Sequence, residues 1–189
     1  MQDLYTGMSG QFFAMSAFLW RGYNVAVPAV DVGEDVFVVD AGNGTLRRVQ
    51  VKTAGTGTIE GSTKTVQFSL SRSQLNLSMG GSELFFMLLA RWDDVDPSRP
   101  WRFILIRRDL LNDLRTRPRV TKRGQPPKPD SAAGDTLTMK VRLSATDAKA
   151  WEQSLSDYLD SWSADWPVAG PMQAIHRGGA VTPAGPPGP

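Results

Sequence analysis

Two apolar runs separated by a short turn place the strongest limit on the fold of this chain. Residues 84–92 read LFFMLLARW and residues 101–107 read WRFILIR. Continuous apolar runs of this length are typical of strands that are covered on both faces of a sheet. We therefore expect two central strands joined by a turn over residues 93–100.

A hairpin is predicted upstream of these two strands. Residues 35–40 (DVFVVD) and 46–53 (LRRVQVKT) are rich in β-branched residues and flank the dipeptide Asn43-Gly44. Asn-Gly favours the tight turns of β-hairpins, so the two runs should pair antiparallel. Further strands are expected at residues 24–30, 66–70 and 136–143.

Helices are expected between these strands, at residues 6–21, 71–79, 109–117 and 144–162. In the last of them Ser144 would begin the helix with Asp147 in its first turn, which is a favourable start. Trp151, Tyr158 and Trp162 recur at spacings of seven and four, which suits one buried helical face. The order of elements predicts an α/β domain with a central mixed β-sheet flanked by helices.

The domain is expected to span residues 1–166. Residues 167–189 are rich in proline and glycine, a composition that buries little apolar surface, so we expect a disordered tail there. Residues 12–20 are an apolar run of nine residues, well short of the roughly 18–20 that a membrane-spanning helix needs. We therefore expect a cytoplasmic protein with no membrane partner.

Composition excludes several chemistries. The chain has no cysteine, which removes disulfides, thiolate nucleophiles and cysteine-rich zinc sites. It has one histidine, His176, and this lies in the proline- and glycine-rich tail, which argues against a Ser-His-Asp triad or a two-histidine zinc site. The short Gly55-Thr56-Gly57 run does not make a phosphate-binding loop.

The charge is unevenly distributed. The whole chain has a net charge of +2, whereas residues 101–128 carry +7 and residues 145–166 carry −4. A basic segment in a nearly neutral chain suits contact with a phosphate backbone, although it also suits a solvated loop. The residues that we expect to contact DNA are Arg102, Arg107, Arg108, Arg115, Arg117, Arg119, Lys122 and Arg123.

Three polar side chains should meet at one end of the hairpin. Gln50 and Lys52 lie two residues apart, so both emerge from the same face of their strand while Val51 points the other way. If the hairpin pairs as predicted, Asp35 comes close to both of them. A carboxylate, an amide and an ammonium group would then lie together.

Such a cluster suits phosphodiester hydrolysis, which requires a hard divalent cation, an activated water and positive charge near the reacting phosphate. Asp35 can supply a charged metal ligand, Gln50 a side-chain oxygen and Val51 a backbone carbonyl, while Lys52 can activate the water. The same residues also fit an ordinary strand, with the polar side chains in solvent and Asp35 closing a turn.

Four segments together resemble the PD-(D/E)xK nuclease superfamily, and in particular its Holliday-junction-resolvase-like endonucleases with a Gln-x-Lys signature. These segments are residues 10–13 (GQFF), residues 19–27 (LWRGYNVAV), Asp35 before an apolar strand, and residues 49–53 (VQVKT). The resemblance covers about residues 5–110. It implies a restriction-endonuclease-like fold, in which a central mixed sheet is flanked by helices, and cleavage of DNA with Mg²⁺ or Mn²⁺.

The resemblance also assigns roles to residues. Asp35 matches the metal-binding aspartate of the family, Gln50 takes the place of its second acid, and Lys52 matches its lysine. Gln11 stands where many relatives have a glutamate that helps to hold the metal or its water. The resemblance thus implies a metal-dependent DNA endonuclease and leaves a homodimer open. The alternative is a nuclease fold that has lost catalysis and serves as a DNA-binding or protein-interaction module.

Overall fold

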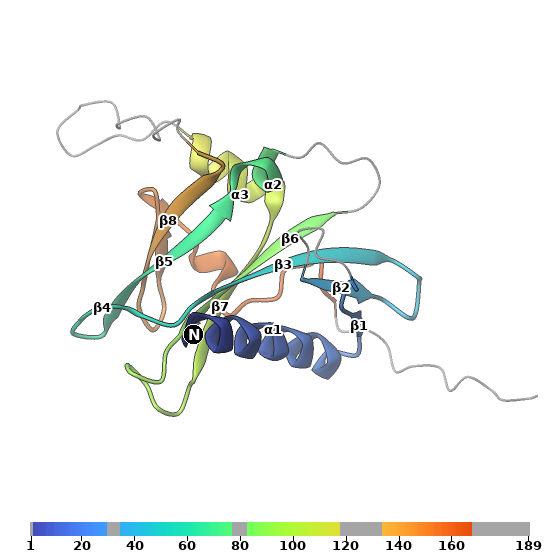
Figure 1. Ribbon diagram of the computed structural model, residues 1–189, viewed down its shortest axis with the longest axis horizontal. Helices are drawn as coiled ribbons and strands as arrows, with labels where there is room; N and C mark the ends of the chain where they lie inside the picture. Colours follow the sequence, from blue (N-terminus) through green and yellow to red (C-terminus); the bar gives the residue numbers. More distant parts are fainter. Residues whose placement is uncertain (1, 30–34, 77–82, 118–133, 168–189) are drawn as a thin grey trace, which may run out of the picture.

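The computed structural model describes residues 2–29, 35–76, 83–117 and 134–167, and these form two five-stranded sheets with three α-helices (Figure 1). The first sheet has the strand order β1-β2-β3-β6-β7. Its strands are β1 (Asn24–Ala26), β2 (Val36–Val39), β3 (Leu46–Ala54), β6 (Leu84–Arg91) and β7 (Trp101–Arg107).

The first sheet is mixed and forms the centre of the molecule. β3 and β6 run parallel, and the other neighbouring pairs run antiparallel. Every residue of β6 from Leu84 to Ala90 is buried, because this strand is covered on both faces. The predicted strand at β6 is confirmed as central, whereas β7, also predicted to be central, lies at the edge of this sheet. The predicted hairpin of β2 with β3 is confirmed, and it pairs Val36 with Val49.

The helix α1 (Gln2–Trp20) covers one face of the first sheet (Figure 1). Its buried residues Ala14 and Phe18 belong to the same core cluster as Val49 and Met87. Gly10 allows a close approach, since a Cβ atom there would come within 2.1 Å of the Thr53 hydroxyl oxygen. This contact fixes the position of α1 along β3.

The opposite face is covered by the second sheet together with α2 (Arg72–Asn76) and α3 (Arg108–Thr116). The central sheet is therefore flanked by helices, as predicted. The second sheet is antiparallel throughout. It consists of β10 (Gln153–Ser154), β9 (Ala148–Ala150), β8 (Thr136–Leu143), β5 (Thr63–Ser71) and β4 (Gly57–Glu60).

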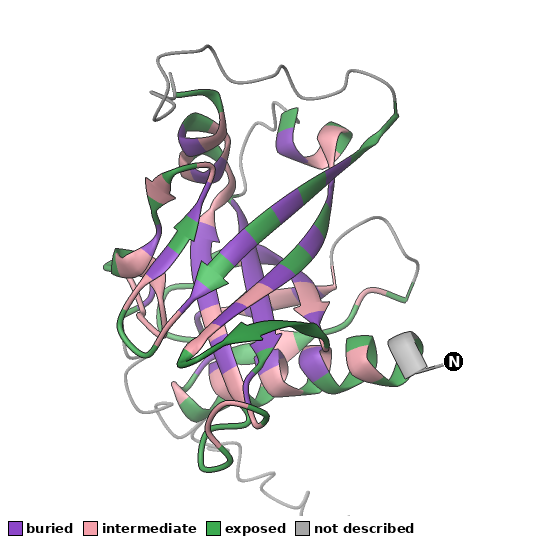
Figure 2. Ribbon diagram, turned by 90° about the vertical axis from the view of Figure 1, so that its left-hand side faces the viewer, coloured by how far each residue is buried: buried purple, intermediate pink, exposed green. Residues whose placement is uncertain are grey.

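Two strands of the second sheet follow the period of two that the sequence shows. Residues of β8 alternate between exposed and buried along the whole strand, and Figure 2 shows these alternating bands on the long strands of this sheet. The strands at residues 66–70 and 136–143 were predicted, but their separation into a sheet of their own was not. A sequence pattern gives the period of a strand and not its neighbour.

The prediction of a helix over residues 144–162 is wrong. The chain instead forms β9, β10 and a single 3₁₀ turn, η1 (Ser156–Tyr158). Trp151 and Glu152 have φ values of 52° and 61°, so they form a tight turn of the kind that joins two hairpin strands. The Ser144 hydroxyl does accept a hydrogen bond from the Asp147 amide, at 3.1 Å, but this closes a turn and begins no helix.

The described chain ends in an aromatic cluster beneath α1. The Trp166 side chain is fully buried and packs edge-to-face against Tyr23 and Phe85 and at a tilt against Phe18. Residues 168–189, which include most of the predicted tail, lie outside the described residues. Among the helices that the structure describes, none is long and apolar enough to cross a membrane.

Candidate functional site

The site lies where β2 begins, beside the part of β3 that continues beyond it. The described pairing of β2 with β3 ends at Val36 and Val49, and the Asp35 amide donates to the Val49 carbonyl at 3.1 Å. β3 continues to Ala54 beside β6. Asp35 therefore lies where β2 and β3 separate, next to a stretch of β3 that has no partner from β2 among the described residues. We call this place the β2–β3 fork.

The Asp35 carboxylate is held by donors from β3. Its Oδ2 atom accepts hydrogen bonds from the Gln50 side-chain amide at 2.6 Å and from the Val51 backbone amide at 2.7 Å. Hydrogen bonds to a carboxylate are stronger than those between neutral groups, so this pair fixes the side chain. The structure thus brings Asp35, Gln50 and Val51 together.

Gln50 is 4% exposed and connects Asp35 to a third element. Its Oε1 atom accepts a hydrogen bond of 2.7 Å from the side-chain amide of Gln74, on α2. The result is a chain of polar groups from Gln74 through Gln50 to Asp35. The sequence analysis missed Gln74, because the position of α2 over β3 depends on how the second sheet packs and leaves no local signal.

A pocket of about 270 Å³ opens beside Asp35, between α1 and residues 51–53 of β3. The Gln11 side-chain amide reaches across it and donates to the Asp35 backbone carbonyl at 2.9 Å. This contact is possible because the neighbouring residue, Gly10, lets α1 lie close to β3. The residues lining the pocket are Leu4, Gly7, Met8, Gln11, Asp35, Val51, Lys52 and Thr53.

Lys52 lines this pocket and is half-buried. Within the described residues its ammonium group has no hydrogen bond or ion pair. Gln50, by contrast, does not line the pocket. Of the four predicted catalytic residues, three line the pocket (Asp35, Lys52 and Gln11) and Gln50 does not.

The donor set fits a hard divalent cation with a low ligand charge. Asp35 has a carboxylate, and Gln11 and Val51, which line the same pocket, each have a neutral oxygen. The described residues contain no group of three or more Asp, Glu, His or Cys side chains that could hold a metal. Mg²⁺ is commonly held by one or two carboxylates and completes its shell with water and substrate phosphate, which such a site allows.

The basic residues of the 101–128 segment do not form one uniform surface. The Arg102 side chain is 2% exposed, and its guanidinium donates to Asp160 and to the carbonyls of Ser144 (2.9 Å) and Ala145 (3.1 Å). Its predicted contact with DNA is therefore wrong, because the whole guanidinium group is enclosed by the protein. Arg102 instead joins β7 to the segments before β9 and after η1.

The remaining described basic residues lie at or on α3. Arg107 pairs with Asp109 at 2.6 Å and with Glu83 at 3.6 Å. Arg108 and Arg115 are half-buried, and Arg117 is exposed just beyond the end of the helix. The other predicted DNA contacts, Arg119, Lys122 and Arg123, lie outside the described residues.

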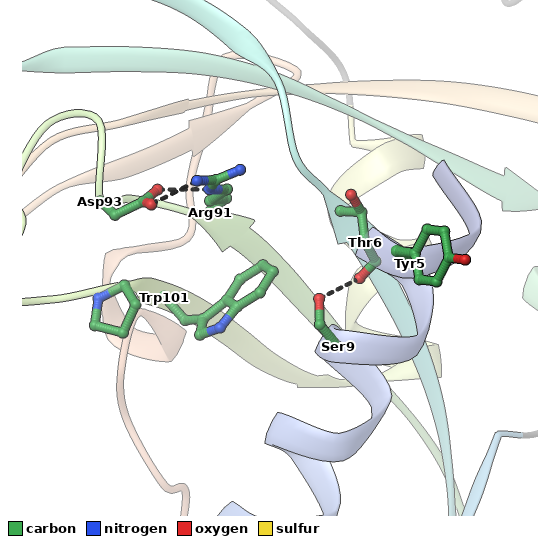
Figure 3. A pocket seen from close by; sticks show the side chains of 7 residues that line it. Tyr5, Thr6, Ser9, Arg91, Asp93 and Trp101 are labelled. Atoms are coloured by element: carbon green, nitrogen blue, oxygen red, sulfur yellow. Dashed lines mark hydrogen bonds and ion pairs between the residues drawn. The ribbon is translucent and has the colours of Figure 1, made fainter. Parts of the chain in front are cut away.

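A second hollow, of about 440 Å³, lies on another side of α1 (Figure 3). Tyr5 and Ser9 border it from the helix, and Arg91, Asp93 and Trp101 border it from the ends of β6 and β7. The hydrogen bond from Arg91 lowers the pKa of the Asp93 carboxyl group, so this ion pair persists in mildly acidic solution. Because Arg91 and Asp93 neutralise each other, this hollow is less suited than the fork to an ionic ligand.

Comparison with known proteins gives a likeness in structure and none in sequence. No family model matches the sequence, and no curated protein matches it. The solved structure of a bacterial homing endonuclease, I-Ssp6803I, is similar with a TM-score of 0.46 and 17% sequence identity, over 83% of this chain and 86% of that chain. The geometry of the site itself is therefore the basis for its function.

Proposed function

We propose that this protein is a metal-dependent endonuclease that hydrolyses phosphodiester bonds in DNA. The observation that carries the proposal is that Asp35 and Lys52 line one pocket at the β2–β3 fork. Gln11 and Val51, each of which has a neutral oxygen, line the same pocket. A carboxylate, neutral oxygens and a cation in one hollow are the groups that phosphodiester hydrolysis requires.

Each residue has a distinct task in this proposal. Asp35, together with oxygens of Gln11 and Val51, would hold Mg²⁺ or Mn²⁺. When bound, the cation polarises the phosphate and makes a coordinated water more acidic. Lys52 holds a water or a phosphate oxygen by hydrogen bonding and stabilises the negative charge that develops during attack. Gln50 keeps the Asp35 carboxylate in one orientation.

The DNA backbone would be held by residues of α3. Arg108, Arg115 and the adjacent Arg117 carry positive charge on this helix, which contacts α2. α2 in turn reaches the site, through the hydrogen bond from Gln74 to Gln50. Positive charge on this helix favours a phosphate polymer by releasing its condensed counterions.

One observation favours the second candidate, a DNA-binding module without catalysis. The Gln50 oxygen is occupied by the Gln74 amide, and its nitrogen points at Asp35. A metal ligand at position 50 would require the amide to turn over, which exchanges its oxygen and nitrogen. A site that lacks this ligand holds a cation through Asp35 as its single described carboxylate, and ligand charge sets cation affinity.

A cleavage assay tests the first proposal. Purified protein is incubated with supercoiled, linear and branched DNA in Mg²⁺ or Mn²⁺, beside Lys52→Ala and Asp35→Asn. The control is Lys140→Ala, which removes a lysine from an exposed position of β8. We expect the wild type and the control to cut and both site variants to lose at least about 100-fold in rate, since general acid–base groups contribute roughly 10²–10⁴-fold.

Equal inertness of all four proteins on every substrate would contradict catalysis. Calorimetry with Mg²⁺ and Mn²⁺ then separates the two candidates. A nuclease binds the cation with a dependence on Asp35, whereas a binding module shows no such dependence and still binds DNA with an affinity that falls steeply as salt rises.

A further inference from the structure

The outer face of α1 is apolar although it is exposed. Trp20 is 93% exposed, Tyr5 68% and Phe12 59%, and Leu4, Met8 and Leu19 are also largely in solvent. We call these six side chains the α1 ridge. In Figure 2, exposed and intermediate residues follow α1 along most of its length, whereas the strands behind it are mainly buried. An apolar surface of this extent marks an interaction site in a water-soluble domain.

The ridge follows the spacing of a helix that packs on another helix. Tyr5, Met8, Phe12 and Leu19 are separated by three, four and seven residues, which puts them on one line along the helix. They lie opposite the buried face formed by Ala14 and Phe18. α1 therefore carries two apolar faces, and the described part of the chain covers one of them.

The ridge has no charged residue, and this suits a partner with the same surface. From Leu4 to Trp20 the sequence has no charged residue, so an identical surface can approach without like-charge repulsion. Tyr5 and Leu19 lie seven residues before and after Phe12. A second α1 that runs antiparallel across Phe12 would therefore place Tyr5 of each copy against Leu19 of the other.

The area of the ridge is adequate for such a contact. An aromatic side chain buries roughly 150–250 Å², so the exposed parts of Tyr5, Phe12 and Trp20 amount to roughly 450 Å² per copy. That is more than half of the roughly 800 Å² per partner in a stable interface of standard size. Leu4, Met8 and Leu19 add to it.

We propose that the α1 ridge is the interface of a symmetric homodimer, with two antiparallel α1 helices that cross at Phe12. Two-fold symmetry requires a self-complementary surface, and the ridge is one. Leu4 and Met8 belong both to the ridge and to the lining of the Asp35 pocket. The dimer would therefore carry one pocket on each side of the helix pair. This inference does not depend on the proposed reaction.

The mass of the full chain in solution tests the proposal. Light scattering after size exclusion, at micromolar concentration, should give twice the mass of the chain for the wild type. Phe12→Glu should halve that mass, because it puts two carboxylates at the two-fold axis. The matched control is Ile59→Glu, at a position of β4 that is 42% exposed and far along the chain from α1. It should remain a dimer.

Cross-linking tests the same geometry without a charge. The chain has no cysteine, so a single Phe12→Cys change gives one thiol per copy. Mild oxidation should convert most of this variant to a disulfide-linked dimer and leave Ile59→Cys monomeric on a denaturing gel. A wild type with the mass of one chain would overturn the proposal. So would a Phe12→Glu variant that remains a dimer, or a monomer whose ridge binds phosphatidylcholine vesicles.

Discussion

The Asp35 cluster and the two buried ion pairs of this protein use charge in opposite ways. At the β2–β3 fork, Asp35 is held by neutral amide groups. Lys52, the basic residue in the pocket lining, has no hydrogen-bond or ion-pair partner among the described residues. Elsewhere, Lys64 and Arg102 are enclosed and matched by acceptors on several sides. The comparison separates charges that stabilise the fold from charges that are exposed to a ligand.

The enclosed pairs are completely satisfied. The Lys64 side chain is 0% exposed, and its ammonium donates to Asp94 at 2.6 Å and to the Arg91 carbonyl at 2.7 Å. Arg102 pairs with Asp160, whose other oxygen accepts from the Phe103 amide at 2.9 Å. A buried charge is tolerated only with such partners, so these residues are fixed by the fold and cannot bind a ligand.

Replacement of Arg102 by leucine should have the largest effect. It removes the buried guanidinium that donates to Asp160 and to the carbonyls of Ser144 and Ala145, and breaking a buried pair in this way costs about 3–5 kcal/mol. Urea unfolding followed by circular dichroism measures the free energy of unfolding. A loss below about 1 kcal/mol would show that Arg102 is not the enclosed structural residue described above.

Lys64→Met should have the next largest effect. It keeps the length of the side chain and removes the ammonium, so its three hydrogen bonds, one to the Arg91 carbonyl and two to Asp94, are lost, at about 1.5–3 kcal/mol. The cost stays below that of Arg102→Leu because the Asp94 side chain is 41% exposed and can be hydrated once it is unpaired. The same unfolding measurement checks this order, and a reversed order would break the comparison.

Gln50→Glu should make the stability of the protein depend on a divalent cation. It places a second carboxylate 2.6 Å from Asp35 Oδ2, where the amide now donates. Without a divalent cation, we expect a loss of about 1–3 kcal/mol from the unsatisfied contact and like-charge repulsion. Millimolar Mg²⁺ should restore the stability of this variant and leave the wild type little changed. Thermal unfolding with and without EDTA measures both, and an equal response of the two proteins would contradict a cation site.

Lys52→Ala should have the smallest effect on stability. Its ammonium has no partner among the described residues, so the free energy of unfolding should change by no more than about 0.5 kcal/mol. Activity or DNA affinity should nevertheless fall. A large loss of stability would place Lys52 with the structural charges and remove it from the site.

Much of the central sheet could be predicted from local patterns. The Asn43-Gly44 turn, the apolar run of β6 and the period of two along β3 each depend on a few neighbouring residues. The pairing of Val36 with Val49 then brings Asp35 next to Gln50 without any further information. This is why the hairpin end of the site could be located from the sequence.

Other features depend on residues far apart in the chain. The spacing of Trp151, Tyr158 and Trp162 suits a helix, yet positive φ angles at Trp151 and Glu152 turn the chain into a hairpin beside β8. Arg102 lies within a basic segment by sequence, but acceptors 42 to 58 residues away enclose it. Gln74 reaches Gln50 only after the second sheet has placed α2.

The sequence by itself determined the hairpin, the strands β6 and β7, and the positions of Asp35, Gln50 and Lys52 along the hairpin, because turn chemistry and side-chain period act over a few residues. The tertiary structure decided which charges became enclosed, which face of α1 stayed in solvent, and which polar group met Gln50. These outcomes follow from the packing of distant segments, and burial and solvation of a side chain are properties of that packing.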